Sequence, residues 1–206
     1  MDKRFAIFDM DGTLIDSMGY WHALAEEYLR AKGVEDIPAD LPQRIETMTM
    51  TESAALFRRE FGLSATAETL AAEMNAMMEE HYRRDIPLKG DILRELGRLQ
   101  GRGIRMCVAS ATAGHLIEAC LSRLGVRSFF DFLLSCEEVG AGKDRPDIYL
   151  TAAARLGAEP GDIAVYEDAL YAARTAKAAG FYVVGVPETE DLGGIADEIY
   201  KEEYSQ

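Results

Sequence analysis

Basic residues and cysteines are scarce in this sequence of 206 residues, and both shortages narrow the range of functions. Lysine and arginine together number 22 against 36 acidic residues, which leaves a formal net charge of −14. A protein of that charge repels nucleic acids and anionic membranes, so neither is an expected partner. The three cysteines, Cys107, Cys120 and Cys136, have no close spacing, which predicts neither a disulfide framework nor a zinc site.

Long apolar runs are also missing. No stretch of the chain approaches the roughly 20 apolar residues that a membrane-spanning helix needs. The first residues, MDKRF, lack the apolar segment of a signal peptide, so we expect a cytoplasmic location. With 48 % apolar and 28 % charged residues, the composition is typical of a globular protein. A monomer is the default expectation.

Short apolar runs indicate buried strands of a parallel sheet. They span residues 5–9, 104–109, 130–135, 163–167 and 182–186. Most are continuous in apolar residues, as in strands that are covered on both faces. Helical patterns separate the later runs, at residues 92–99, 116–124, 148–156 and 169–179. This alternation of strands and helices predicts an α/β fold with a doubly wound parallel sheet.

Residues 16–86 interrupt the alternation, because they contain no convincing strand. Helical patterns fill this segment instead, at residues 18–31, 41–48, 51–61 and 67–84. We therefore expect two domains. Residues 1–15 and 87–206 form the core with the sheet, and residues 16–86 form an inserted α-helical domain.

Polar side chains follow the predicted strands, at the strand ends or, for Lys143, in the loop after the third strand. The set comprises Asp9 and Asp11, Ser110 and Thr112, Lys143, and Glu167 and Asp168. Ligands of open parallel sheets bind beyond the carboxyl ends of the strands, so these side chains are expected to converge on one crevice.

The four carboxylates of this set would repel one another unless a cation joined them. Oxygen ligands of this kind suit Mg²⁺, which binds through one or two carboxylates and a substrate phosphate. Mg²⁺ and Lys143 together would create a positive site in a negative protein. The inferred chemistry is phosphoryl transfer, with one carboxylate as the nucleophile and a second acid moving the proton.

Four segments resemble the motifs of the haloacid dehalogenase (HAD) superfamily of hydrolases. DMDGT at 9–13 resembles the first motif, Ser110 in VASAT the second, Lys143 in GKDRPD the third, and Glu167–Asp168 in VYEDA the fourth. Their order and spacing match along nearly the whole chain. The helical insertion is similar to the cap of the β-phosphoglucomutase-like phosphatase branch, and the resemblance implies a Rossmann-like core with this helical cap.

The resemblance implies metal and acid–base roles for the acids. Asp9 would be the nucleophile that becomes an aspartyl-phosphate, and also a Mg²⁺ ligand. Asp11 would be the general acid/base, with its backbone carbonyl on the metal. Asp168 would bind Mg²⁺, and Glu167 would help either directly or through a water molecule.

The resemblance also implies how the substrate is held and what the reaction is. Ser110 would hydrogen-bond a phosphoryl oxygen, and Lys143 would neutralise the nucleophile and the phosphate. The cap is expected to govern substrate choice and to exclude water. The implied function is Mg²⁺-dependent hydrolysis of a small phosphorylated metabolite, such as a sugar phosphate.

A sugar phosphomutase of the same branch is the alternative. Those mutases carry a cap arginine for a second phosphate, whereas the matching stretch here, residues 47–53 (TMTMTES), has no basic residue. They also carry a histidine where this chain has Trp21, unless a shift of one residue brings His22 there. Both departures favour hydrolysis. After Lys143 the family commonly has proline, and the acid found here, Asp144, would pair with Arg145 or weaken the local positive charge.

Overall fold

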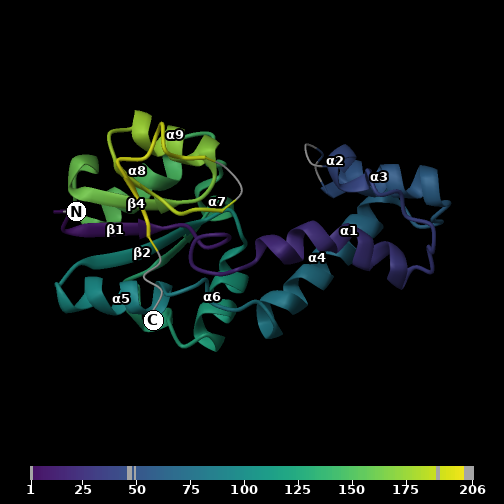
Figure 1. Ribbon diagram of the computed structural model, residues 1–206, viewed down its shortest axis with the longest axis horizontal. Helices are drawn as coiled ribbons and strands as arrows, with labels where there is room; N and C mark the ends of the chain where they lie inside the picture. Colours follow the sequence, from purple (N-terminus) through teal and green to yellow (C-terminus); the bar gives the residue numbers. More distant parts are fainter. Residues whose placement is uncertain (1, 46–47, 49, 189–190, 202–206) are drawn as a thin grey trace. The chain divides into compact units, whose positions relative to one another are not determined.

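The computed structural model describes residues 2–45, 48, 50–188 and 191–201, and it divides the chain into two compact units (Figure 1). Unit 1 comprises Met1–Ser17 and Ile86–Gln206, and unit 2 comprises Met18–Asp85. The chain runs from unit 1 into unit 2 and back again, so unit 2 is an insertion in the chain of unit 1.

Unit 1 is built on a six-stranded parallel sheet with the order β3-β2-β1-β4-β5-β6. The strands are β1 (Phe5–Phe8), β2 (Arg105–Ser110), β3 (Leu133–Ser135), β4 (Ile163–Glu167), β5 (Tyr182–Gly185) and β6 (Glu198–Ile199). The prediction of a doubly wound parallel sheet is confirmed. The strand order reverses between β1 and β4, and such a switch point is where open α/β sheets bind ligands.

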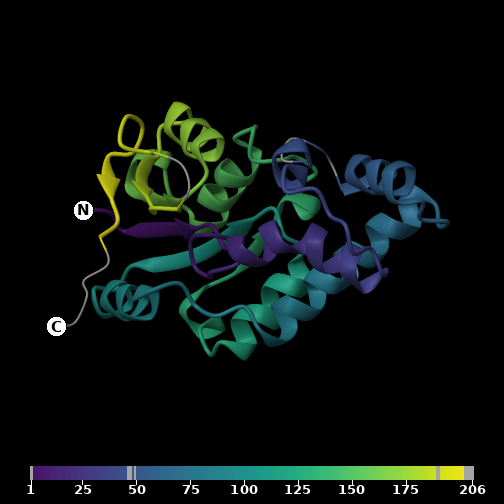
Figure 2. The same cartoon turned by 45° about the vertical axis from the view of Figure 1, so that its right-hand side comes forward.

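Helices cover both faces of the sheet (Figures 1 and 2). Helices α5 (Ile92–Gly101) and α6 (Gly114–Arg123) lie on one face, and α8 (Asp147–Leu156) and α9 (Leu170–Ala178) lie on the other. Short turns of helix complete the unit, namely α7 (Cys136–Val139), η1 (Arg127–Phe129) and η2 (Pro160–Asp162). Because both faces are covered, β1 is apolar throughout, and Ala6, Ile7 and Phe8 are fully buried.

Several boundaries differ from the predicted ones. β1 ends at Phe8, so Asp9 follows the strand instead of closing it. The third strand is Leu133–Ser135 and not 130–135, because Phe130 is bonded back to Arg127 (N–O 3.2 Å) and ends the η1 turn. β6 and α7 were not predicted.

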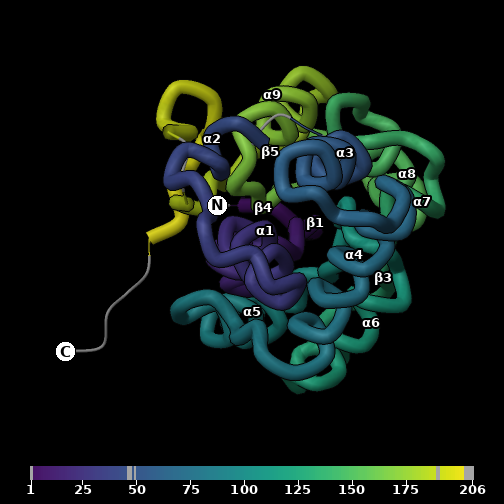
Figure 3. Tube along the Cα trace, turned by 90° about the vertical axis from the view of Figure 1, so that its right-hand side faces the viewer, coloured from purple at the N-terminus to yellow at the C-terminus, as the bar shows by residue number. Residues whose placement is uncertain are grey.

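Unit 2 is helical, with α1 (Met18–Ala31), α2 (Leu41–Ile45), α3 (Met50–Phe61) and α4 (Ala67–Arg84) (Figure 3). The predicted bounds of α1 and α4 are confirmed. The helix predicted at 41–48 ends at Ile45, while residues 46, 47 and 49 lie outside the described residues. The three longer helices each bury large side chains: Leu24 and Tyr28 in α1, Phe57 in α3, and Leu70, Met74, Met78 and Tyr82 in α4. In neither unit do the described residues include a helix long and apolar enough to cross a membrane.

The two segments that connect the units run side by side within unit 1. Ile15 and Leu88 form an antiparallel bridge. The Asp16 amide donates to the Pro87 carbonyl (3.0 Å), and the Lys89 amide donates to the carbonyl of Leu14 (3.0 Å). The two connecting segments are therefore bonded to each other within unit 1, at the place where unit 2 is inserted.

Candidate active site

The carboxyl ends of β1 and β4 bring three carboxylates together. Asp9 directly follows β1, and its amide donates to the Tyr166 carbonyl (3.0 Å), which continues the pairing of the two strands. Glu167 ends β4, and Asp168 follows it. One oxygen from each of Asp9, Glu167 and Asp168 lies within 4.8 Å of the others, and all three residues are buried. They lie at the switch point of the sheet.

Lys143 bridges two of these carboxylates. Its ammonium group donates to a carboxylate oxygen of Asp9 and to Oε1 of Glu167 (2.6 Å). The hydroxyl of Tyr149 donates to the same Oε1 atom (2.8 Å). One buried lysine against three buried carboxylates leaves the group short of positive charge, and a bound cation would relieve the remaining repulsion.

Burial and repulsion shift the pKa values of this group. Burial raises the pKa of Asp9 well above its usual range; Lys143 opposes the rise, and the neighbouring acids add to it. Burial and the charge of Glu167 raise the pKa of Asp168 to about 7. Burial disfavours a charged Lys143, but the charges of Asp9 and Glu167 outweigh burial and hold its pKa well above the usual value. Perturbed carboxylates beside a protonated lysine are typical of functional sites.

Asp11 is not a member of the three-carboxylate group, although it is only two residues from Asp9. Two hydroxyl groups hold its carboxylate. Ser17 donates to Oδ1 (2.7 Å), and Thr112 donates to Oδ2 (2.6 Å). Gly12 then turns the chain with a φ of +77°, a conformation that favours glycine. The carboxylate of Asp11 is therefore oriented but only partly buried.

Ser110 ends β2 and is almost completely buried. Its hydroxyl oxygen accepts the amide hydrogen of Thr112 (3.1 Å), which shapes the loop before α6. On the opposite side of β1, the Thr13 hydroxyl donates to Oδ1 of Asp168 (3.3 Å).

Sequence reasoning missed several groups that orient the site. Thr13 stands in the DMDGT segment, so its neighbours could have pointed to it, and Ser17 follows a few residues later. Tyr149 lies in a helix with ordinary apolar spacing, and nothing in the sequence distinguishes it from a core residue.

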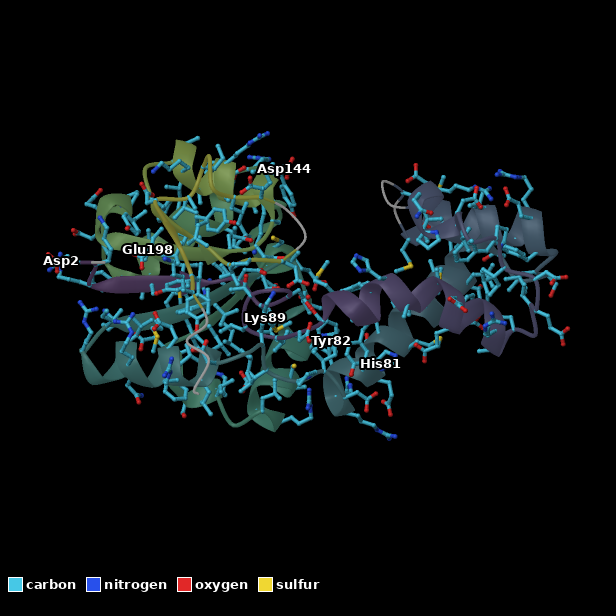
Figure 4. The ribbon with its side chains drawn as sticks, viewed as in Figure 1. Asp2, His81, Tyr82, Lys89, Asp144 and Glu198 are labelled. Atoms are coloured by element: carbon cyan, nitrogen blue, oxygen red, sulfur yellow. The ribbon has the colours of Figure 1, made fainter. Side chains whose placement is uncertain are left out.

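Asp144 does not pair as the sequence suggested. It lies at the surface of unit 1 (Figure 4). Arg145 instead forms its ion pair with Asp147 (3.1 Å). The Asp144 carboxylate folds back toward Gly142, where a Cβ atom would lie only 2.8 Å from Oδ1.

Three buried carboxylates and a bonded lysine at the switch point of a parallel sheet are typical of the active site of an α/β enzyme. A family model described as haloacid dehalogenase-like hydrolase matches residues 4–180. The chain belongs to this family of hydrolases.

Known proteins resemble the chain over most of its length. It is 29 % identical over 190 residues to hexitol phosphatase B of Escherichia coli (strain K12), and the matched region covers 90 % of this chain and 84 % of the relative. It is 30 % identical over 205 residues to beta-phosphoglucomutase of Bacillus subtilis (strain 168), covering 93 % and 86 %. The crystal structure of CbbY from Rhodobacter sphaeroides in complex with phosphate matches with a TM-score of 0.74 at 25 % identity, covering 96 % and 93 %.

Proposed function

We propose that the protein is a Mg²⁺-dependent phosphatase that hydrolyses a small phosphorylated metabolite, a sugar phosphate or a similar phosphomonoester. Unit 1 is the catalytic core, and unit 2 is a cap that governs substrate choice. The observation that carries the proposal is the buried group of Asp9, Glu167 and Asp168 with Lys143 bonded into it. Membership in a hydrolase family and the likeness to hexitol phosphatase B support the reaction class.

The residues present fit a magnesium ion. Three buried carboxylates offer oxygen atoms within 4.8 Å of one another, and such oxygens are the ligands that Mg²⁺ prefers. Asp9, Asp168 and the backbone carbonyl of Asp11 would hold the ion, and Glu167 would assist directly or through a water molecule. A bound Mg²⁺ supplies positive charge that neutralises the phosphoryl group.

Asp9 is the nucleophile in this proposal. One of its carboxylate oxygens attacks phosphorus, the bond from phosphorus to the leaving oxygen breaks, and an aspartyl-phosphate results. Lys143 counters the negative charge on the nucleophile and the phosphoryl group, and Ser110 donates a hydrogen bond to a phosphoryl oxygen. Asp11 protonates the leaving oxygen. A water molecule then attacks phosphorus as Asp11 takes its proton, the bond between phosphorus and the Asp9 oxygen breaks, and phosphate is released.

A sugar phosphomutase is the second candidate, and the 30 % identity to beta-phosphoglucomutase favours it. A mutase returns the phosphoryl group to a second sugar hydroxyl instead of to water. Trp21 is the residue expected at the position of the mutase histidine, unless a shift of one residue brings His22 there. Trp21 donates its indole N–H to the Tyr82 hydroxyl (3.2 Å), and an indole cannot relay a proton in this chemistry. Residues 47–53 contain no basic side chain, although 47 and 49 lie outside the described residues. These features favour hydrolysis.

Incubation with a panel of sugar and polyol phosphates tests the proposal, with Mg²⁺ and after treatment with EDTA. We expect phosphate release that depends on Mg²⁺. It should fall by about 10³-fold or more in Asp9→Asn, because the variant lacks the carboxylate that attacks phosphorus and the remaining residues of the site cannot replace it. Asp162→Asn is the matched control, because Asp162 pairs with Arg4 before β4 and is remote from the acids. An isomeric sugar phosphate as the product would support the mutase. Phosphate release that survives both EDTA and Asp9→Asn would overturn both candidates.

A further inference from the structure

Lys89 belongs to none of the motifs, yet its side chain is largely buried in unit 1 (Figure 4). Its ammonium group donates to the carbonyl oxygen of Gly12 (2.6 Å) and forms an ion pair with Glu188. The side chains of Lys89 and Glu188 are only 13 % and 18 % exposed. A charge this buried needs its partners. Three segments meet at Lys89: the loop after β1, the return from unit 2, and the loop after β5.

The Gly12 carbonyl belongs to the tight turn that carries Asp11. Within this turn, the Gly12 amide donates to Ile15 (3.0 Å), and the Leu14 amide donates to Met10 (2.9 Å). Lys89 holds the same turn at two further points, because its side chain binds the Gly12 carbonyl and its backbone amide binds the Leu14 carbonyl (3.0 Å). The peptide group between Gly12 and Thr13, one residue beyond Asp11, is therefore held by a residue 77 positions away from Gly12 in the sequence.

The turn that Lys89 holds also contacts the group of acids. Lys143 donates to Asp9 and Glu167, whereas Asp168 accepts from Thr13 in this turn. Lys89 is therefore connected, through the turn, to the acid of the group to which Lys143 makes no hydrogen bond.

We propose that Lys89 is a positioning residue that holds Asp11, through the Gly12 carbonyl, at the geometry needed to protonate the leaving oxygen, and that Glu188 orients Lys89. The inference rests on the proposed function, in which Asp11 gives its proton to the leaving oxygen as the bond to phosphorus breaks. A leaving group that departs as a stable anion needs no such proton. Loss of Lys89 should therefore harm esters of poor leaving groups selectively.

Phenyl phosphate and 4-nitrophenyl phosphate form a matched pair for this test, since the nitro group makes the second leaving anion much more stable and much less in need of a proton. In Lys89→Met we expect kcat/KM, which reports the steps up to departure of the leaving group, to fall about 10- to 100-fold for phenyl phosphate and less than about 3-fold for 4-nitrophenyl phosphate, because a misplaced general acid loses much of its effect. Lys177→Met removes the same charge from an exposed ion pair with Asp197 and should match wild type on both esters. Equal losses on the two esters in Lys89→Met would overturn the proposal, as would behaviour like that of Lys177→Met.

Hydrogen exchange of the free protein tests the holding role without catalysis. Amide hydrogens of residues 10–15 should exchange about 10-fold faster in Lys89→Met, because the turn opens more often, and at the wild-type rate in Lys177→Met. Glu188→Gln keeps Lys89 but removes its ion pair, so it should give an intermediate increase even if Lys89→Met does not fold. Wild-type exchange in Glu188→Gln and in Lys89→Met would overturn the proposal. If wild-type protein hydrolyses no phosphate ester, the proposed function fails, while faster exchange still supports Lys89 as the residue that holds the turn.

Discussion

In a Lys143→Met variant, two buried carboxylates would face each other without the ammonium group that now joins them. The side chains of Lys143 and Asp9 are 4 % and 8 % exposed, and that of Glu167 is 1 % exposed. Removing one partner of a buried ion pair costs roughly 3–5 kcal/mol, because the remaining charge stays buried and unpaired. Two carboxylates lose their partner here, so we expect a loss in the upper part of that range, about 4–5 kcal/mol.

Thermal and urea unfolding in EDTA at neutral pH measures this loss. In a protein of this size each 1 kcal/mol lowers Tm by about 2–4 °C, so the expected fall is roughly 8–20 °C. Lys177→Met is the control, because loss of its exposed ion pair should cost at most about 1 kcal/mol. The double variant Lys143→Met/Glu167→Gln removes one of the unpaired charges and should be more stable than Lys143→Met alone. A Lys143→Met variant as stable as Lys177→Met would refute the reasoning.

Two further predictions concern unit 2. Burial would lower the pKa of His81, but hydrogen bonds to Asp85 and Glu27 outweigh burial and raise it. That stabilisation is complete below the ordinary pKa of about 6.5 and is lost as pH rises through the higher native pKa. In urea unfolding, His81→Gln should therefore lower the free energy of unfolding more near about pH 6 than near about pH 9. A loss of the same size at both pH values would contradict this. Thr66→Ala removes the oxygen that accepts the Thr69 amide (3.2 Å) at the start of α4 and should cost about 1 kcal/mol. Thr66→Ser, which keeps the oxygen, should cost less, and equal losses would argue against the cap.

Long elements with strong patterns could be predicted from the sequence. The apolar stripe of α1, together with Gly33 just beyond the helix at a φ of +83°, predicted both ends of that helix correctly. Short elements could not. β6 has two residues, too few to show a period, and Phe130 is apolar because it packs in the core and not because it lies in a strand.

The acids stood out because charged residues directly after apolar runs are costly unless they have a purpose, and Lys143 stood out through the GKDRPD segment that resembles a family motif. Tyr149 and Lys89 could not be identified in the same way. Each contacts a residue far from its own place in the sequence, 18 positions away for Tyr149 and 77 for Lys89, and a single tyrosine in a helix or a single lysine in a loop is ordinary. Their importance depends on which carboxylate or carbonyl the fold brings to them, and no local pattern encodes that.

The paired segments around Ile15 and Leu88 mean that the chain leaves the sheet-bearing unit and re-enters it at adjacent points. We therefore expect that a turn of a few residues can replace residues 18–85 without moving any strand, and that a foreign helical segment can be grafted at the same junction. Under the proposed function, in which unit 2 governs substrate choice, exchange of that segment between genes would give one hydrolytic framework new selectivities while its sheet stays untouched.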